Sequence, residues 1–308
     1  MAVAAAGCQA GSPAGASAEG SSGKTVVASI YPLGWLSGQV GGDRLGVSTL
    51  TEPGVEPHDL ELTPRQAVEI GSADLVVYIK GMQPAVDDTI TSRDATAKAL
   101  DATTLIEPLH VTGEAEEEHG HEHGHEHGEE QGHGAETIDP HLWLDPSRMA
   151  TVATALGERF AKVDPEGAAG YRQRAKAAAA ELTKLDEEFR TGLKTCDSRT
   201  MVANHQAFGY LADRYDLKQI SISGVDAEAE PSPAQLARAA DLARKEKVTT
   251  IFTETLLSPK VAQVLAREVG VKTAVLDPVE GTKEGSTDTY PSVMRRNLQT
   301  LRTALGCR

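Results

Sequence analysis

Residues 248–281 read VTTIFTETLLSPKVAQVLAREVGVKTAVLDPVEG. The β-branched run over 248–253 predicts a buried strand, 259–269 predicts a helix, and 272–276 predicts a second strand. Two strands joined by a helical crossover lie parallel in one sheet. The stretch therefore predicts a βαβ unit of an α/β fold.

The same alternation recurs along most of the chain. Further strands are expected at residues 25–30, 45–50, 74–79, 200–203 and 218–222. Further helices are expected at residues 32–40, from Pro64 with Thr63 as N-cap, at 147–163 and 165–194, from Gln206, at 233–245 and from Tyr290. The helix over 165–194 would be a rod of roughly 42 Å, long enough to bridge two lobes.

The predicted architecture is α/β, with two lobes that each hold a mainly parallel sheet flanked by helices. The N-terminal lobe is expected over residues 24–164 and the C-terminal lobe over 196–308, joined by one long rigid helix over 165–195. The 308 residues are enough for two lobes of this kind.

Charge and hydropathy exclude two classes of partner. The formal net charge of −15 repels phosphate backbones, so nucleic acid is not an expected ligand. The sequence contains no apolar stretch near the roughly 18 residues that a membrane-spanning helix needs. Membrane attachment is therefore expected only through a lipid anchor.

Residues 114–136 read EAEEEHGHEHGHEHGEEQGHGAE and contain no large apolar side chain. Such a segment cannot offset its ordering entropy by burial, so a disordered surface loop is expected within the first lobe. Its histidines would gather Zn²⁺ at weak auxiliary sites, or the loop is a solvated insertion without a role. The histidines concerned are His119, His121, His123, His125, His127 and His133, whereas His110 just outside the segment is expected to be a structural edge residue.

The three cysteines suggest one pairing and one separate use. Cys8 follows a run of small residues and precedes a Gly/Ala/Ser/Glu stretch, which is typical of a lipoprotein cleavage site. We expect lipidation of Cys8, a disordered tether over residues 1–23, and a signal region before residue 1; the alternative is an unstructured segment with a free thiol. Cys196 and Cys307 lie beside predicted element ends and are expected to form a disulfide in an oxidising compartment.

Three histidines outside the acidic segment lie at junctions between predicted elements, where α/β folds place ligand-binding groups. They are His58, His141 and His205, and Asp277 follows the last predicted strand. Three imidazoles and one carboxylate suit tetrahedral Zn²⁺ better than Ca²⁺ or Mg²⁺. The spacings are too wide for a zinc finger, and each histidine taken alone fits an ordinary polar loop residue.

Four segments resemble, in order and context, the ligand-bearing segments of the zinc/manganese solute-binding proteins of ABC importers, the ZnuA/TroA-like family. They are EPHDLELTP (56–64), DPHLWLDP (139–146), NHQAFGY (204–210) and VLDPVEG (275–281), and the similarity runs from about Lys24 to the C-terminus. The resemblance implies that His58, His141, His205 and Asp277 are metal ligands. Manganese-selective relatives typically have Glu in place of His205, which favours Zn²⁺ here.

The resemblance also implies a place in the cell. It implies a monomeric protein outside the cytoplasm, a cell-surface or periplasmic lipoprotein, that captures Zn²⁺ and delivers it to the membrane permease of an ABC transporter. Some zinc relatives carry Glu directly before the first ligand; this chain has Pro57 there and Glu56 one position earlier. The long helix would limit the lobes to small relative movements.

Several residues near the ligands have two interpretations. Asp59, Asp139 and Asp145 are positioned to orient imidazole N–H groups, although helix capping explains Asp145 equally well. Glu254 is expected to act as a cap or loop residue rather than to line the cleft. Trp143 is expected to shield the site by packing.

Other functions remain open from the residues. A manganese or broad-specificity protein of the same family is the main alternative. A zinc metallohydrolase is disfavoured because the chain has no HExxH motif and because a fourth protein ligand fills the position that catalysis needs. A surface adhesin with incidental metal is a further alternative, and we expect that the protein is not an enzyme.

Overall fold

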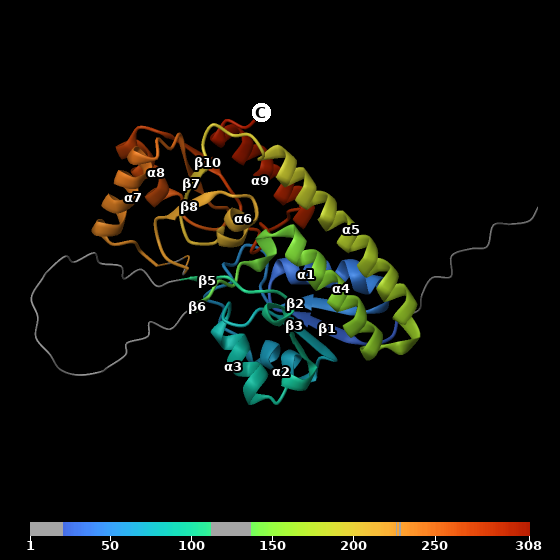
Figure 1. Ribbon diagram of the computed structural model, residues 1–308. Coiled ribbons are helices and arrows are strands. Elements are labelled where there is room, and N and C mark those ends of the chain that lie inside the picture. Colours follow the sequence, from blue (N-terminus) through green and yellow to red (C-terminus); the bar gives the residue numbers. More distant parts are fainter. Residues whose placement is uncertain (1–20, 112–136, 226, 228) are drawn as a thin grey trace, which may run out of the picture.

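The computed structural model describes residues 21–111, 137–225, 227 and 229–308. Two four-stranded sheets, each all parallel, form its centre (Figure 1). The N-sheet has the order β2-β1-β3-β4 and the C-sheet the order β10-β9-β7-β8. Their strands are β1 (Thr25–Ala28), β2 (Gly46–Thr49), β3 (Leu75–Tyr78), β4 (Ala99–Asp101), β7 (Thr200–Ala203), β8 (Lys218–Ser221), β9 (Thr250–Thr253) and β10 (Lys272–Val275). The predicted α/β class is confirmed.

Helices cover the N-sheet on both faces. α1 (Tyr31–Gly41) lies on the face toward the centre of the molecule, while α2 (Pro64–Ser72) and α3 (Pro84–Ser92) form a small separate core on the other face. The predicted cap of α2 is present, because the Thr63 side chain accepts from the Gln66 backbone and the Gln66 side chain accepts in return.

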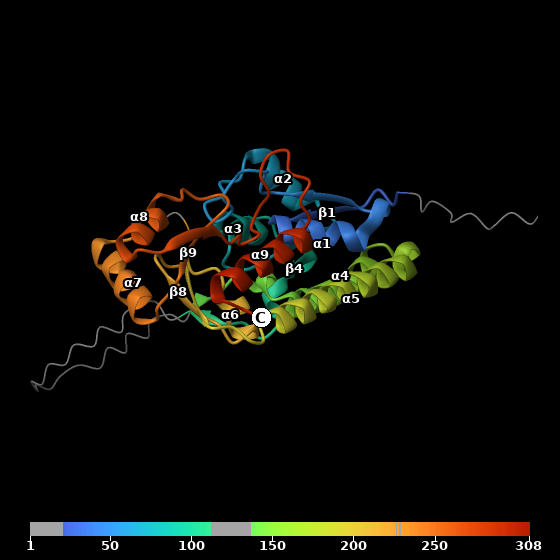
Figure 2. The same cartoon turned by 90° about the horizontal axis from the view of Figure 1, so that it is seen from above.

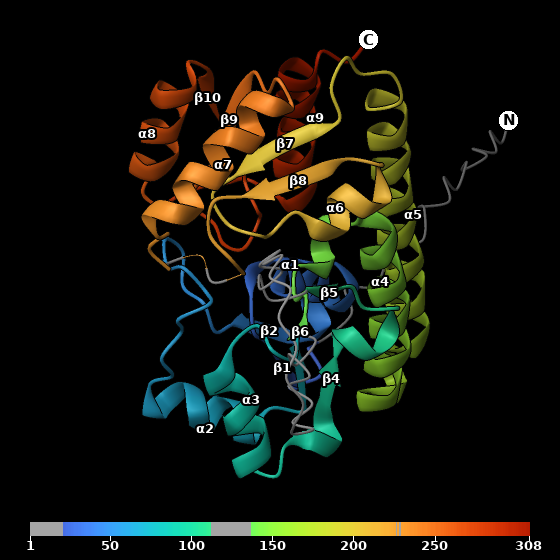
Figure 3. The same cartoon turned by 60° about the vertical axis from the view of Figure 1, so that its left-hand side comes forward.

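Two long helices run side by side along one flank of the molecule (Figure 3). α4 (Pro146–Val163) and α5 (Ala168–Gly192) are joined by a short 3₁₀ turn at Pro165–Gly167. Figure 3 shows α5 passing along one side of both sheets, and it contacts α1, α4 and α9. Its 25 residues correspond to a length of about 38 Å, so the predicted rod is present with slightly shorter ends.

The C-sheet is also covered on both faces. α7 (Pro233–Lys245) and α8 (Lys260–Val269) enclose an outer core, and α6 (Gly209–Arg214) and α9 (Tyr290–Leu305) pack toward α4 and α5. Figure 2 shows α7 and α8 at one end of the molecule and the turn between α4 and α5 toward the other.

A two-residue antiparallel pair, β5 (His110–Val111) and β6 (Thr137–Ile138), flanks residues 112–136. His110 is exposed there, in agreement with its expected edge position. The predicted tether with Cys8 falls mainly, and the His-rich loop entirely, outside the described residues. Within the described residues, no helix has both the length and the apolar character to span a membrane.

One apolar cluster extends from the N-sheet to the C-sheet. It includes Val26 and Val77 of the N-sheet, Leu182 of α5, and Met201 and Phe252 of the C-sheet, all at most 1% exposed. A close-packed core resists large rearrangement. The two halves are therefore held together by shared packing as well as by α5.

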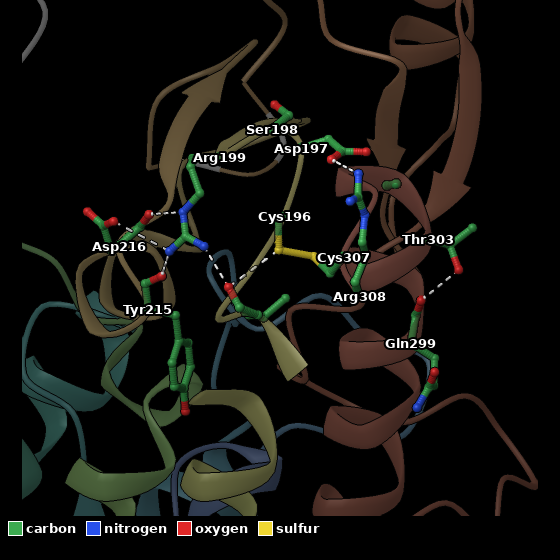
Figure 4. Close-up of a disulfide and its surroundings, with 12 residues drawn as sticks. Cys196, Asp197, Ser198, Arg199, Tyr215, Asp216, Gln299, Thr303, Cys307 and Arg308 are labelled. Carbon is green, nitrogen blue, oxygen red and sulfur yellow. Dashed lines mark hydrogen bonds and ion pairs between the residues drawn. A yellow bond between two sulfur atoms is a disulfide. The ribbon is translucent and has the colours of Figure 1, made fainter. Parts of the chain in front are cut away.

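Cys196 and Cys307 form the predicted disulfide, which joins the segment after α5 to the end of α9 (Figure 4). Arg308 pairs with Asp197 beside it at 2.8 Å. The bond lies before β7 begins, at the amino edge of the C-sheet, away from the edge that carries the site described next.

Candidate metal centre

Four side chains from distant parts of the chain converge at one point. One ligand atom from each of His58, His141, His205 and Glu280 lies within 4.8 Å of all the others. His141 and His205 are fully buried, the Glu280 side chain is 2% exposed, and that of His58 is 10% exposed. The predicted convergence of the three histidines is present.

The fold places these residues at facing edges of the two sheets. His58 lies in the loop between β2 and α2, and His141 lies just before α4. His205 follows β7 and Glu280 follows β10, both at the carboxyl edge of the C-sheet. Ligands in open α/β sheets bind at this edge.

Glu280 is at the centre of the group. Its Oε1 lies 3.5 Å from His58 Nε2, 3.3 Å from His141 Nε2 and 3.2 Å from His205 Nε2. The Nε2 atoms of His58 and His141 are 3.2 Å apart. Three imidazole nitrogens and one carboxylate oxygen that face one another form a donor set suited to a tetrahedral cation such as Zn²⁺.

The protonation equilibria of the group are strongly coupled. Burial acts to raise the pKa of Glu280, but the nearby His205, His141 and His58 outweigh it and hold this pKa well below its usual range. Burial likewise opposes the charged form of His205, yet Glu254 and Glu280 raise its pKa well above 6.5. The buried group is thus built to hold positive charge beside the carboxylate.

Two carboxylates fix the orientation of the buried imidazoles. Asp139 Oδ1 accepts from the backbone N–H of His141 at 2.9 Å and lies 2.8 Å from its Nδ1. Glu254 accepts from the backbone N–H of His205 at 3.0 Å and lies 2.6 Å from its Nδ1. A proton on each Nδ1 leaves Nε2 as the donor atom toward the centre.

The roles predicted for these carboxylates are partly wrong. Asp139 acts as expected, and Asp145 accepts from Ser147 and caps α4, which was its alternative role. Asp59 is exposed and lies outside the group. Glu254 is not merely a cap or loop residue. The sequence signal for this role is that Glu254, like His205, follows a predicted strand; the structure shows that these strands, β9 and β7, are neighbours.

The structure does not bring Asp277, the expected fourth ligand, into the group. Its Oδ2 accepts from the Thr255 hydroxyl at 2.5 Å, and its Oδ1 accepts from the Val279 backbone at 2.8 Å. Glu280 takes the central place instead. The chain turns after β10 through Val279, whose φ is +60°, so that the later of the two carboxylates faces the histidines.

The loop that carries His58 contains a further, half-buried acid. Glu56 Oε2 accepts from the His58 backbone at 2.9 Å. Burial and the nearby Glu280 raise the pKa of Glu56 to about 8. The loop therefore brings an acid that favours its neutral form to the most exposed side of the group.

Trp143 closes the site from the side of α4. Its ring centroid lies 5.2 Å from that of His141, and its Nε1 donates to the Pro278 carbonyl at 2.7 Å. The side chain is fully buried. The predicted packing role is confirmed, and Trp143 also ties the N-terminal half to the turn that carries Glu280.

Comparison with known families agrees with this architecture. Residues 26–304 match the family model described as ZnuA, zinc-uptake complex component A periplasmic. The chain belongs to the ZnuA family. The recognition drawn from four short segments is thereby confirmed over most of the sequence.

Relatives within the ZnuA family are of two lengths. The chain is 35% identical over 288 residues to zinc-binding protein AdcA of Streptococcus pyogenes, covering 90% of this chain and 55% of AdcA. It is 34% identical over 288 residues to the high-affinity zinc uptake system protein ZnuA of Bacillus subtilis, covering 91% and 87%. The chain thus spans about half the length of the streptococcal relatives it matches.

A solved structure from the same family shows the same fold. The Zn(II)-bound ZnuA-like domain of Streptococcus pneumoniae AdcA superposes with a TM-score of 0.74 at 31% identity, covering 92% of this chain and 99% of that domain.

Proposed function

We propose that this ZnuA-family chain captures one Zn²⁺ with His58, His141, His205 and Glu280 and delivers it to an ABC importer. The observation that carries the proposal is the approach of the four ligand atoms to within 4.8 Å of one another. Three nitrogen donors favour Zn²⁺ over the harder Mn²⁺, which prefers oxygen. The zinc-binding names of the relatives support the same cargo.

Each half of the molecule supplies two ligands. His58 and His141 come from residues 24–164 and His205 and Glu280 from residues 196–308, which we treat as two lobes. Zinc would therefore link the lobes. Because a core is shared between them, we propose that release involves local loop movement rather than wide opening. The loop of His58, the most exposed ligand, is the element proposed to move.

The place of action and the partners belong to the same proposal. The family description names zinc uptake and the periplasm, which supports a location outside the cytoplasm and a permease as partner. We also propose three properties from the sequence: lipid anchoring through Cys8, a monomeric state, and weak zinc capture by the loop histidines.

The ligand set does not favour catalysis at this centre. A catalytic zinc keeps an open coordination position for water or substrate, whereas four protein ligands complete a tetrahedron. The acids beside the ligands are each already engaged: Asp139 and Glu254 with imidazole Nδ1 atoms, and Glu56 with the His58 backbone N–H. The arrangement therefore favours holding a cation over activating water.

Zinc titration against a competing chelator tests the proposal. We expect one tight site, and stabilisation by about 4 kcal/mol when free Zn²⁺ is a thousand times its Kd. His205→Ala and Glu280→Gln should each remove most of this stabilisation, because the first deletes a nitrogen donor and the second replaces the anionic carboxylate by a neutral amide, which is a much weaker zinc ligand. Equimolar competition with Mn²⁺, with the bound metal measured by mass spectrometry, should leave zinc in the site.

His110→Ala is the matched control, because it removes an exposed histidine outside the group. This variant, and deletion of residues 114–136, should leave the tight site nearly intact. Equal losses from His110→Ala and His205→Ala, or retention of Mn²⁺ over Zn²⁺, would contradict the assignment.

A further inference from the structure

The turn between β10 and Glu280 contains an unusual backbone conformation. Val279 has a φ of +60° and is fully buried. For a β-branched residue this left-handed region is a genuine outlier. The other non-glycine residues with positive φ in the described chain are Asp94, Asp216 and Lys247, all exposed. Backbone outliers of this kind persist only where the surroundings hold them.

Val279 is held by a polar contact with Asp277, which is itself held by contacts from two other elements. Its backbone N–H donates to Asp277 Oδ1 at 2.8 Å, and Asp277 Oδ2 accepts from Thr255 after β9 at 2.5 Å. Asn297 of α9 bonds both the N–H and the carbonyl of Asp277, at 3.0 and 2.6 Å. The Asp277 carboxylate is thus committed to the turn.

The conformation of Val279 determines where the side chain of the next residue, Glu280, points. Glu280 directly follows Val279, and its Oε1 lies 3.2 to 3.5 Å from three imidazole Nε2 atoms. A change of φ at Val279 from the left-handed to the extended region would redirect the Glu280 side chain away from the histidines. The clamp on Val279 therefore decides where the fourth donor atom lies.

We propose that Asp277 is a positioning residue, which clamps Val279 in its left-handed conformation and so presents Glu280 to the three histidines. The proposal rests on the proposed function, since Glu280 is taken as the fourth zinc ligand. A zinc ligand at this position would need its negative charge. In the proposed role, zinc affinity depends only on the oxygen of Asp277 that accepts from the Val279 N–H.

A pair of substitutions separates these roles. Asp277→Ala removes the acceptor for the Val279 N–H and should weaken zinc binding about tenfold or more, as loss of a residue that orients a ligand does. Asp277→Asn keeps an oxygen that accepts from the backbone two residues on, and should bind zinc within about threefold of the native protein. Zinc Kd is measured for both by chelator competition.

Two further measurements make the test specific. X-ray absorption at the zinc edge should show three nitrogen donors and one oxygen donor in both the native protein and Asp277→Asn. In a Val279→Gly background the loss caused by Asp277→Ala should shrink, because glycine occupies positive φ without help. Circular dichroism and unfolding of the metal-free variants check that each one folds.

Failure of the positioning role and failure of the zinc site would give different binding results. Similar large losses from Asp277→Asn and Asp277→Ala would make the charge itself necessary and overturn the positioning role, and near-native binding by both would overturn the clamp. If Glu280→Gln binds zinc like the native protein, the proposed site fails, which is a different result from failure of the clamp alone.

Discussion

At the scale of single residues, Gly209 lies where a side chain would disturb the metal centre. It begins α6, and a Cβ there would lie 2.4 Å from Asp139 Oδ2. In an ordinary helix, Gly→Ala stabilises by about 0.5–1 kcal/mol. In Gly209→Ala, however, we expect weaker zinc binding. The added methyl group displaces the Asp139 carboxylate that orients His141, so zinc affinity, measured by chelator competition, should fall about tenfold.

Gly38→Ala is the control for this prediction. Gly38 lies in α1, and a Cβ there would have no other atom within 4 Å. This variant should raise the free energy of unfolding by about 0.5–1 kcal/mol and leave zinc affinity unchanged. Unchanged affinity in Gly209→Ala would show that Asp139 adjusts without loss.

Single residues also mark the limit of prediction from sequence. Junction positions, donor chemistry and the family resemblance together identify His58, His141 and His205. They do not suffice to choose between Asp277 and Glu280, because the choice depends on one backbone angle at Val279. Glu254 is missed for a related reason, since its contact with His205 joins residues 49 apart through strand order.

At the scale of elements, the disulfide closes most of the C-terminal half into one covalent loop. Cys196 and Cys307 are 111 residues apart, and closing a loop of about 100 residues restricts the unfolded chain by up to about 4.7 kcal/mol. We expect the double variant Cys196→Ser/Cys307→Ser to lose about 2–5 kcal/mol of unfolding free energy in urea. Its zinc affinity should be native, because the bond lies at the amino edge of the C-sheet.

Reduction of the native protein provides the comparison. Dithiothreitol should lower the stability of the native protein toward that of the double variant and leave the variant itself unchanged. A loss of zinc affinity in the double variant would show that the disulfide also shapes the carboxyl edge of the sheet.

Elements with a strong local pattern are the ones that sequence predicts well. Helix α7 and strand β7 have the predicted bounds, because periodicity and a capping Ser232 act within the segment itself. Helix α6 was expected from Gln206 and begins at Gly209 instead. The backbone N–H groups of His205 and Gln206 donate to Glu254 and to the Gly224 carbonyl, and these contacts with residues distant in sequence leave no local pattern. The pair β5 and β6 is too short to leave a periodic signal.

At the scale of the whole molecule, the lobes are joined through polar contacts as well as through the core. Asp186 of α5 accepts from Arg214 of α6 at 2.7 Å and from the buried Tyr215 hydroxyl at 3.1 Å. Trp143 donates across to Pro278. Sequence alone predicts two lobes and a rod, but the extent of their shared packing depends on side chains distant in sequence.

The metal centre makes the stability of the metal-free molecule depend on pH. The pKa values of His141 and His205 are raised, so the stability they contribute is present below about 6.5 and lost as pH rises through their folded values. The pKa of Glu56 is raised to about 8, so it too costs stability as pH rises from 4.5 toward 8. Glu280 has a lowered pKa and loses its contribution only as pH falls well below 4.5.

The stability of the metal-free molecule and the stability gained on adding zinc should therefore change with pH in opposite directions. With EDTA present, unfolding free energy in urea should fall between about pH 6 and pH 8.5, whereas the gain on adding zinc should grow over the same range, because zinc needs neutral imidazoles. Glu280→Gln removes one carboxylate that raises the histidine pKa values and should flatten the metal-free slope. Glu246→Gln, at an exposed ion pair with Lys218, should leave it unchanged. Metal-free stability that rises between pH 6 and pH 8.5 would contradict the raised pKa values of His141, His205 and Glu56.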